Sequence, residues 1–177
     1  YATVPPPRDG TVGLGACADF VPAALAAGAR FVAVVNPAMP DPPGSPRLPL
    51  DRVAAWTEAE GALAGLGPVA PDPASWAIAG HVAGLLRPGD TLQLGLGKLQ
   101  TAVLEAVADR GPRDLGYHAG MISDPILPLL RKGLFPRGLT TGVALGGPAF
   151  YDALTEIDAR FRPVGETHAI ATLAALP

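Results

Sequence analysis

Short β-branched runs alternate with segments of helical spacing along this chain, and this alternation constrains its fold more than any other feature. Phe31 to Val35 is the clearest buried strand, an apolar run that ends sharply at Asn36-Pro37. Alternating strands and helices are typical of α/β proteins, in which helices cover a parallel sheet. The sequence therefore predicts an α/β fold with an open, largely parallel sheet and flanking helices.

Apolar periodicity and the positions of proline and glycine predict the remaining elements. Asp124-Pro125 predicts a helix start, at which the aspartate would cap free N–H groups. The Pro/Gly/Ser-rich segment 41–49 predicts a loop. One predicted helix has an apolar face formed by Trp76, Ala79, Ala83 and Leu86. The other predicted helices cover 17–27, 99–108 and 148–157, and the other predicted strands cover 91–94, 115–118 and 140–145.

Proline and glycine also divide the chain. The 21 prolines and 22 glycines fall mostly between the apolar runs and form no repeat, which indicates turns and a linker. We place a domain boundary in the linker 68–73. The chain opens with Tyr1 to Val4, which has the pattern of a strand interior, so we expect a cut chain or one whose first part lies elsewhere.

Composition and charge exclude several classes of protein. Apolar residues make up 49% of the chain and charged residues 16%, which excludes a disordered, charge-rich protein. The net charge is −3 and no basic cluster stands out, so the sequence predicts no nucleic-acid binding. No charge-free segment reaches the ~18 apolar residues of a membrane span, so no membrane association is predicted.

Cysteine and histidine usage predicts neither a disulfide nor a metal site. Cys17 is the only cysteine, which rules out an internal disulfide and favours a reducing, cytoplasmic location. His81, His118 and His168 are far apart in sequence and lack metal-ligand spacing. We therefore predict no metal cofactor.

A glycine loop is the clearest candidate for ligand contact. Gly95-Leu96-Gly97 follows a predicted strand and precedes a predicted helix. Glycines in this position let backbone N–H groups approach an oxyanion or a phosphate, helped by the positive end of the helix. The loop alone is a weak signal, because both the third glycine of a dinucleotide fingerprint and the Gly-Lys-Ser/Thr of a P-loop are missing.

Five segments, in order along the chain, carry a resemblance to a known family. Gln93 to Leu104 is similar to a motif Gln-Leu-Gly-Ile-Gly-x-Ile-Pro-x-Ala-Val-Leu, and Asp114 to Asp124 is similar to Asp-Leu-Gly-Ile-His-Ser/Thr-Glu-Met-x-Ser-Asp. Gly13 to Asp19, Val35 to Pro40 and Thr141 to Tyr151 match three further segments. The chain thus resembles the acetyl-CoA hydrolase/transferase family of class I CoA-transferases, which includes 4-hydroxybutyrate CoA-transferases.

The resemblance implies a domain organisation. Family members are longer and have two similar α/β domains. Residues 1–67 would be the C-terminal part of the first, 68–73 the linker, and 74–177 the N-terminal part of the second. The later segment that completes the active-site cleft has no counterpart here, so a homo- or hetero-oligomer is implied, in which another chain covers the missing surface.

The resemblance also implies chemistry. In the family, a glutamate carboxylate attacks an acyl-CoA thioester and forms covalent intermediates, from which the acyl group or CoA is passed to a carboxylic acid. Backbone N–H groups near the glycine loop would stabilise the developing oxyanion. The implied ligands are coenzyme A or an acyl-CoA, with a small carboxylic acid as acceptor and no metal.

Family roles carry over only where the residues match. Gly120 stands at the position of the family's catalytic glutamate and offers no carboxylate. His118 is a candidate general base toward water, helped by Asp124, which would give thioester hydrolysis. The residues implied to bind substrate or CoA are Gly95, Leu96, Gly97, Asn36, Met39, Met121 and Ser123.

Three interpretations of the glycine stay open. The protein is a diverged enzyme acting on a thioester, a non-catalytic CoA-binding or partner subunit, or a chain with an inactivating change, and we favour the first. Glu166 is an alternative carboxylate and Cys17 an alternative nucleophile, although buried packing is the simpler interpretation of the thiol. The simpler interpretation of Asp124 is a helix cap.

Overall fold

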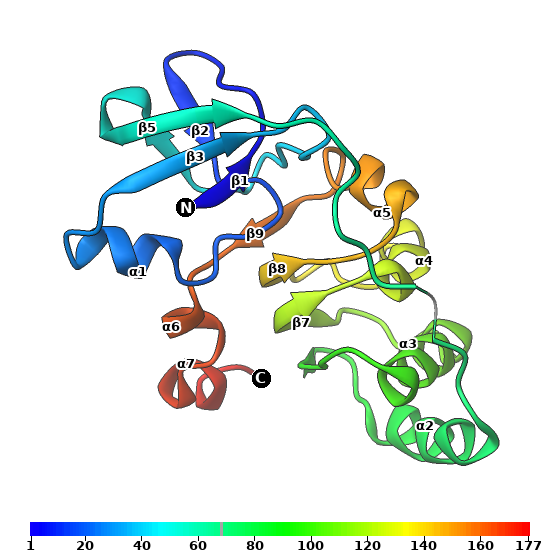
Figure 1. Ribbon diagram of the computed structural model, residues 1–177. Coiled ribbons are helices and arrows are strands. Elements are labelled where there is room, and N and C mark those ends of the chain that lie inside the picture. The colour runs from blue at the N-terminus through cyan, green and yellow to red at the C-terminus, as the bar shows by residue number, and fades with distance from the viewer. Residues whose placement is uncertain (68) are drawn as a thin grey trace.

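Two parallel sheets dominate the computed structural model, which describes residues 1–67 and 69–177. The first sheet has the order β1 (Ala2–Val4), β3 (Phe31–Val35) and β5 (Val53–Glu58), with all pairs parallel (Figure 1). The predicted strand 31–35 is confirmed. Phe31, Ala33 and Val35 are buried while Val32 is exposed, so β3 buries one face more deeply than the other.

The second sheet contains four parallel strands in sequence order. Its strands are β6 (Thr91–Leu92), β7 (Gly116–Ile122), β8 (Leu139–Ala144) and β9 (Ala159–Phe161). The helical segments around it are α2 (Pro73–Leu85), α3 (Lys98–Arg110), η2 (Asp124–Ile126), α4 (Leu127–Arg131), α5 (Pro148–Ala153), α6 (Val164–Thr167) and α7 (Ile170–Ala174). The α/β fold with parallel sheets and flanking helices is therefore confirmed.

Helices cover both faces of the second sheet. α2 packs against α3, and α6 packs against β7 and β8. Figure 1 shows α3, α4 and α5 on one side of the sheet and α6 and α7 on the other. Apolar side chains that recur at helical spacing, such as Val103 and Val107 of α3, are buried in the core, which explains why this stretch folds as a helix.

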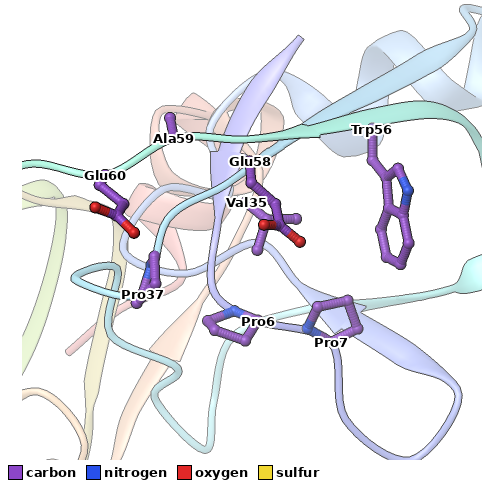
Figure 2. Close-up of a pocket in the computed structure, with 8 residues that line it drawn as sticks. All are labelled: Pro6, Pro7, Val35, Pro37, Trp56, Glu58, Ala59 and Glu60. Atoms are coloured by element: carbon purple, nitrogen blue, oxygen red, sulfur yellow. The ribbon is translucent and has the colours of Figure 1, made fainter.

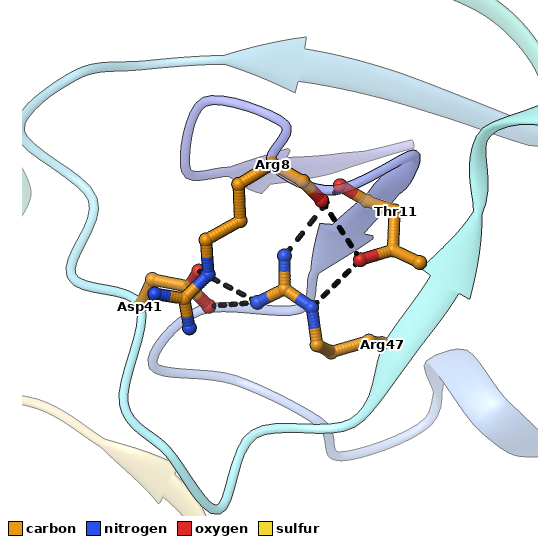
Figure 3. Close-up of polar contacts among 4 residues, drawn as sticks. All are labelled: Arg8, Thr11, Asp41 and Arg47. Atoms are coloured by element: carbon orange, nitrogen blue, oxygen red, sulfur yellow. Dashed lines mark hydrogen bonds and ion pairs between the residues drawn. The ribbon is translucent and has the colours of Figure 1, made fainter.

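A short antiparallel pair interrupts the predicted loop 41–49. β2 (Thr11–Gly13) pairs with β4 (Arg47–Pro49), so the loop prediction is wrong for the last three residues. Arg47 stabilises this pair through two bonds from Nη1 to Asp41, at 2.8 and 2.6 Å, and one from Nε to Thr11 Oγ1, at 2.8 Å (Figure 3). Arg8 Nε lies 2.9 Å from the same carboxylate, so Asp41 joins two arginines from separate segments.

The segment 16–19 joins the two sheets. Ala144 N–H donates to Ala16 O at 2.8 Å and Ala18 N–H donates to Gly142 O at 3.0 Å, and Cys17 forms an antiparallel bridge with Val143. These residues therefore lie beside the C-terminal half of β8, on the edge along which β9 pairs with the N-terminal half. The predicted helix 17–27 is wrong at its start for this reason, and α1 covers only Val21–Ala26.

Other boundaries differ from the predictions. The strand predicted over 91–94 ends at Leu92, and the helix predicted over 148–157 ends as α5 at Ala153. Trp76 is 41% exposed, while Ala79 and Ala83 form the buried face of α2 as predicted. Of the predicted linker 68–73, Pro68 lies outside the described residues, and Pro73 already belongs to α2.

The Asp41 carboxylate generates a prediction about stability. We expect Asp41→Asn to lower the free energy of unfolding by about 2 kcal/mol, because it leaves Arg47 and Arg8 without a charged acceptor. Asp51→Asn, at an exposed position of the neighbouring turn, is the matched control and should change stability by less than about 0.5 kcal/mol. Urea unfolding measures both, and equal effects would contradict the prediction.

Candidate functional site

The glycine loop positions the start of α3. Gly97 is the residue before the helix and has φ 129°, a conformation that favours glycine. Its carbonyl accepts hydrogen bonds from the backbone N–H and the hydroxyl of Thr101, both at 3.0 Å. Within the described residues no side chain caps this helix start. The first-turn N–H groups and the positive end of a 13-residue helix are therefore available to a ligand.

Asp72 fixes that helix start against α2. Its carboxylate accepts from Ser75 N at 2.8 Å, which caps α2, and forms an ion pair with Lys98, the first residue of α3. The hydrogen bond from Lys98 is the main cause that lowers the pKa of Asp72, and the bonds from Ser75 add to it. Sequence analysis missed this pair because nothing in the pattern relates residues 26 positions apart.

A cavity of about 700 Å³ brings two of the predicted motifs together. The glycine loop and α3 contribute to one side, and the turn after β7 contributes to the other. The segment that precedes α2 provides a further wall. The residues that line the cavity are Leu66, Gly67, Val69, Ala70, Pro71, Leu96, Gly97, Thr101, Glu105, Ser123, Asp124, Pro125 and Leu145. Of the predicted binding residues, Leu96, Gly97 and Ser123 are thus placed at one site, whereas Gly95 is exposed outside its lining.

Asp124 anchors the end of the site opposite to the glycine loop. Both carboxylate oxygens lie 3.1 Å from Gly147 N, the residue before α5. A Cβ on Gly146 would collide with this carboxylate, so the glycine permits the close approach. The predicted helix cap is wrong: Asp124 is the first residue of the short helix η2, after Ser123, and its carboxylate binds the backbone N–H of the residue before α5 instead.

Tyr151 holds the chain just before this wall segment in place. Its hydroxyl donates to Ala64 O at 2.7 Å, and burial raises the pKa of this phenol. A Cβ on Gly65 would lie 2.9 Å from Gly146 O, so residues 64 and 65 lie against the turn before α5. The segment that forms one cavity wall is therefore attached to the second sheet.

Gly120 lies in β7 beneath the side chain of His168. A Cβ built on Gly120 would be 2.6 Å from His168 Nε2 and closer still to Cε1. The imidazole therefore occupies the space that any side chain at position 120 would need. The one available signal was the glycine within a strand, which often marks a close approach by another group.

His118 does not form the predicted pair with Asp124. The His118 side chain is 7% exposed, and its Nε2 has no hydrogen-bond partner among the described residues. Asp124 instead binds Gly147, and no hydrogen bond joins the two in the part of the chain that is described. Met121 lies in β7 beside Val143 of β8 and is half-buried.

Asn36 and Met39 lie outside the 700 Å³ cavity and have structural contacts. Asn36 is buried, accepts from Ala38 N at 2.9 Å and donates to Gly61 O at 3.1 Å. Met39 Sδ lies 3.5 Å from Ala16 N, below the turn at Gly15. These contacts account for both residues as supports of the turn after β3.

The two low-priority alternatives also have local explanations. Cys17 is half-buried in the bridge to β8, and burial, followed by the charge of Asp19, raises the pKa of its thiol. A raised pKa reduces thiolate and so disfavours a nucleophile. Glu166 is exposed and lies 3.8 Å from Arg162 Nε.

A second cavity, of about 490 Å³, lies at the carboxyl ends of the first sheet (Figure 2). It is lined by Pro6, Pro7, Val35, Pro37, Trp56, Glu58, Ala59 and Glu60 and shares no residue with the first cavity. Figure 2 shows the Trp56 ring and the Glu58 carboxylate facing the two prolines.

Two further observations bear on ligands. Among residues 1–67 and 69–177, no group of three or more His, Cys, Asp and Glu side chains is placed to hold a metal ion. In the same residues no helix combines the length and the apolar character that a membrane span requires.

The chain is similar in sequence to two coenzyme A transferases, although no family model matches it. It is 27% identical to 4-hydroxybutyrate coenzyme A transferase of Clostridium kluyveri over 173 residues, which covers 93% of this chain and 39% of that protein. It is 31% identical over 104 residues to succinyl-CoA:cyclohexane-1-carboxylate CoA transferase of Geobacter metallireducens, with coverage of 59% and 23%.

Solved structures agree with the sequence matches. The 4-hydroxybutyrate CoA-transferase of Porphyromonas gingivalis aligns with a TM-score of 0.86 at 27% identity, covering 97% of this chain and 46% of that one. RipA of Yersinia pestis aligns with a TM-score of 0.88 at 26% identity, covering 98% and 43%. The chain spans less than half the length of these relatives. In sequence and in fold, the chain is therefore similar to part of the length of CoA-transferases.

Proposed function

We propose that this chain binds an acyl-CoA thioester in the cavity between the glycine loop and Ser123-Asp124, as part of a CoA-transferase-like protein. The observation that carries the proposal is that the two motifs line one cavity of about 700 Å³. Its relatives are named as CoA transferases, which supports coenzyme A or an acyl-CoA as the ligand and a small carboxylic acid as the acceptor.

The start of α3 supplies the chemistry for this ligand. Free first-turn N–H groups and the helix dipole favour an oxyanion or a phosphate next to Gly97. Backbone donors of this kind stabilise the oxyanion that develops when a thioester carbonyl is attacked. Lys98 places a positive charge at the same helix end, although it is partly compensated by Asp72.

Position 120 offers no carboxylate that could act as the nucleophile of such a reaction. A transferase or hydrolase with Gly120 in place of the glutamate is the first reading of the site. The alternative is a non-catalytic CoA-binding or partner subunit, and the imidazole that fills the space above Gly120 favours it over a covalent carboxylate mechanism. We also propose the domain division at 68–73, an oligomer that completes the cleft, and a cytoplasmic location.

Coenzyme A binding tests the proposed function directly. We expect calorimetric titration with CoA to show binding, and Gly97→Ala to weaken it by about tenfold or more, because alanine at φ 129° costs about 1–3 kcal/mol and distorts the loop. Gly95→Ala is the matched control, since no atom lies within 4 Å of its new Cβ and its φ is ordinary. Equal affinities for both variants would contradict a role for Gly97, and no binding by the wild type would overturn the proposed function.

Restoring the carboxylate tests the reading of position 120. We expect Gly120→Glu alone to lower the melting temperature and gain little transferase activity, because the new side chain collides with His168. Gly120→Glu combined with His168→Ala should fold better and transfer CoA between acyl-CoA and a carboxylate. Thermal unfolding and product analysis measure both effects. A double variant that folds and binds CoA but transfers nothing would show that position 120 does not face the thioester.

A further inference from the structure

The cavity of about 490 Å³ at the carboxyl ends of the first sheet has no part in the proposed function. It lies beside β5, the edge strand of that sheet, and shares no residue with the cavity proposed for the thioester. Cavities of roughly 300–1,000 Å³ are the usual size of small-molecule sites. The chemistry of its lining therefore indicates which ligand it would take.

The register of β5 places an indole ring and a carboxylate on one face of the sheet. Trp56 pairs with Ala33, which is 1% exposed. Two residues further along, Glu58 pairs with Val35, which is also buried. Trp56 and Glu58 thus lie on the face of the sheet that elsewhere packs into the core, yet Trp56 is 61% exposed. Its ring is an uncovered aromatic wall of the cavity.

Hydrogen bonds fix the chain that carries the acidic side of this cavity. Ala59 N–H donates to Val35 O at 2.9 Å. The side-chain amide of Asn36 donates to Gly61 O at 3.1 Å. The residues on both sides of Glu60 are therefore held against the end of β3, so the backbone itself shapes this side of the cavity.

The cavity carries two negative charges and no positive one. Glu58 and Glu60 are its charged residues, and neither forms an ion pair in the part of the chain that the structure describes. Arg8, which follows the lining residue Pro7, lies 2.9 Å from the carboxylate of Asp41 instead. Coulomb repulsion therefore disfavours an anion such as CoA in this cavity, and attraction favours a cation.

The rest of the lining is apolar and poor in hydrogen-bond donors. Pro6, Pro7 and Pro37 have no backbone N–H to offer. Figure 2 shows the Trp56 ring and the Glu58 carboxylate facing the first two of these prolines. Such walls suit a cation whose charge is surrounded by alkyl groups, because it needs no hydrogen bonds. Tryptophan is the side chain that attracts such cations best through its ring face.

The spacing along β5 allows one cation to reach both groups. Side chains two positions apart on a strand are separated by roughly 6.6 Å along it. A cation between them lies within the ~6 Å of a ring centroid over which cation–π attraction acts. We propose that this cavity binds a small quaternary alkylammonium compound, with its charged group between the Trp56 ring and the Glu58 carboxylate and near Glu60. The inference is independent of the proposed function.

Titration with choline, a simple quaternary ammonium compound, tests this site. Trp76→Phe leaves Trp56 as the only tryptophan, so choline should change its fluorescence in a saturable way. We expect the neutral analogue of choline, in which carbon replaces nitrogen, to bind about tenfold more weakly or not at all. Phosphocholine should also bind more weakly than choline, because its phosphate would lie beside two carboxylates, and tighter binding would contradict the charge argument.

Two variants test the residues that carry the site. Glu58→Gln removes the charge, and Trp56→Leu removes the ring face but keeps apolar bulk. Both positions are exposed, so both variants should fold. We expect each to weaken choline binding by about fivefold or more in calorimetry. Asp109→Asn, at an exposed position of α3, removes the same charge outside the cavity and is the matched control.

The other outcomes separate this inference from the proposed function. Equal affinities for choline and its neutral analogue, or full choline binding by both variants, would overturn the cation site. So would a wild type that does not bind choline, even if it binds CoA. Choline binding by a wild type that does not bind CoA would support this site and overturn only the proposed function.

Discussion

The structure depends on the backbone pairing between segment 16–19 and β8. β8 pairs with β7 along one edge. Along its other edge, its N-terminal half pairs with β9 and its C-terminal half pairs with Ala16 to Ala18. This segment belongs to the first sheet's half of the chain, yet it completes the hydrogen bonding of a strand in the second. Backbone groups buried at such a junction have to be paired, so the two halves are positioned by the same bonds that satisfy them. Asp19, at the end of the segment, then fixes the start of α6 and with it the position of His168.

The sequence predicted well where one local pattern decides the structure. The strand 31–35 and the helix over 99–108 have strong apolar patterns, and both are confirmed. β5 was missed because all but one of its residues are exposed, which leaves no alternation to recognise. The start of α1 was wrong because residues 17–20 follow a long-range pairing with β8 instead of their helical spacing.

The candidate site shows the same difference between features set by local sequence and features set by long-range contacts. The glycine loop and Ser123-Asp124, which the motif resemblance singled out, line one cavity. It did not predict the partners of these residues, because those partners are distant in sequence. Asp124 binds a backbone group 23 positions away, and His168 lies over Gly120, which precedes it by 48 positions. The glycine at 120 has a steric meaning as well as a chemical one. The identity of residue 120 and the orientation of residue 168 are coupled through shared volume, so neither can be interpreted alone.

The hydrogen bond from Tyr151 to Ala64 links residues 87 positions apart, and it attaches a segment whose residues are mostly exposed. Segments held by few contacts open at free energies well below that of global unfolding, and their amides exchange with solvent early. Leu66, Gly67, Val69 and Ala70 of the cavity wall are exposed, so we expect this part of the wall to open at a lower free energy than the mostly buried strand β7. A ligand that seats against both couples them and slows exchange in the wall. The hydrogen bond from Tyr151 to Ala64 O therefore ties the chain just before this exposed wall to α5.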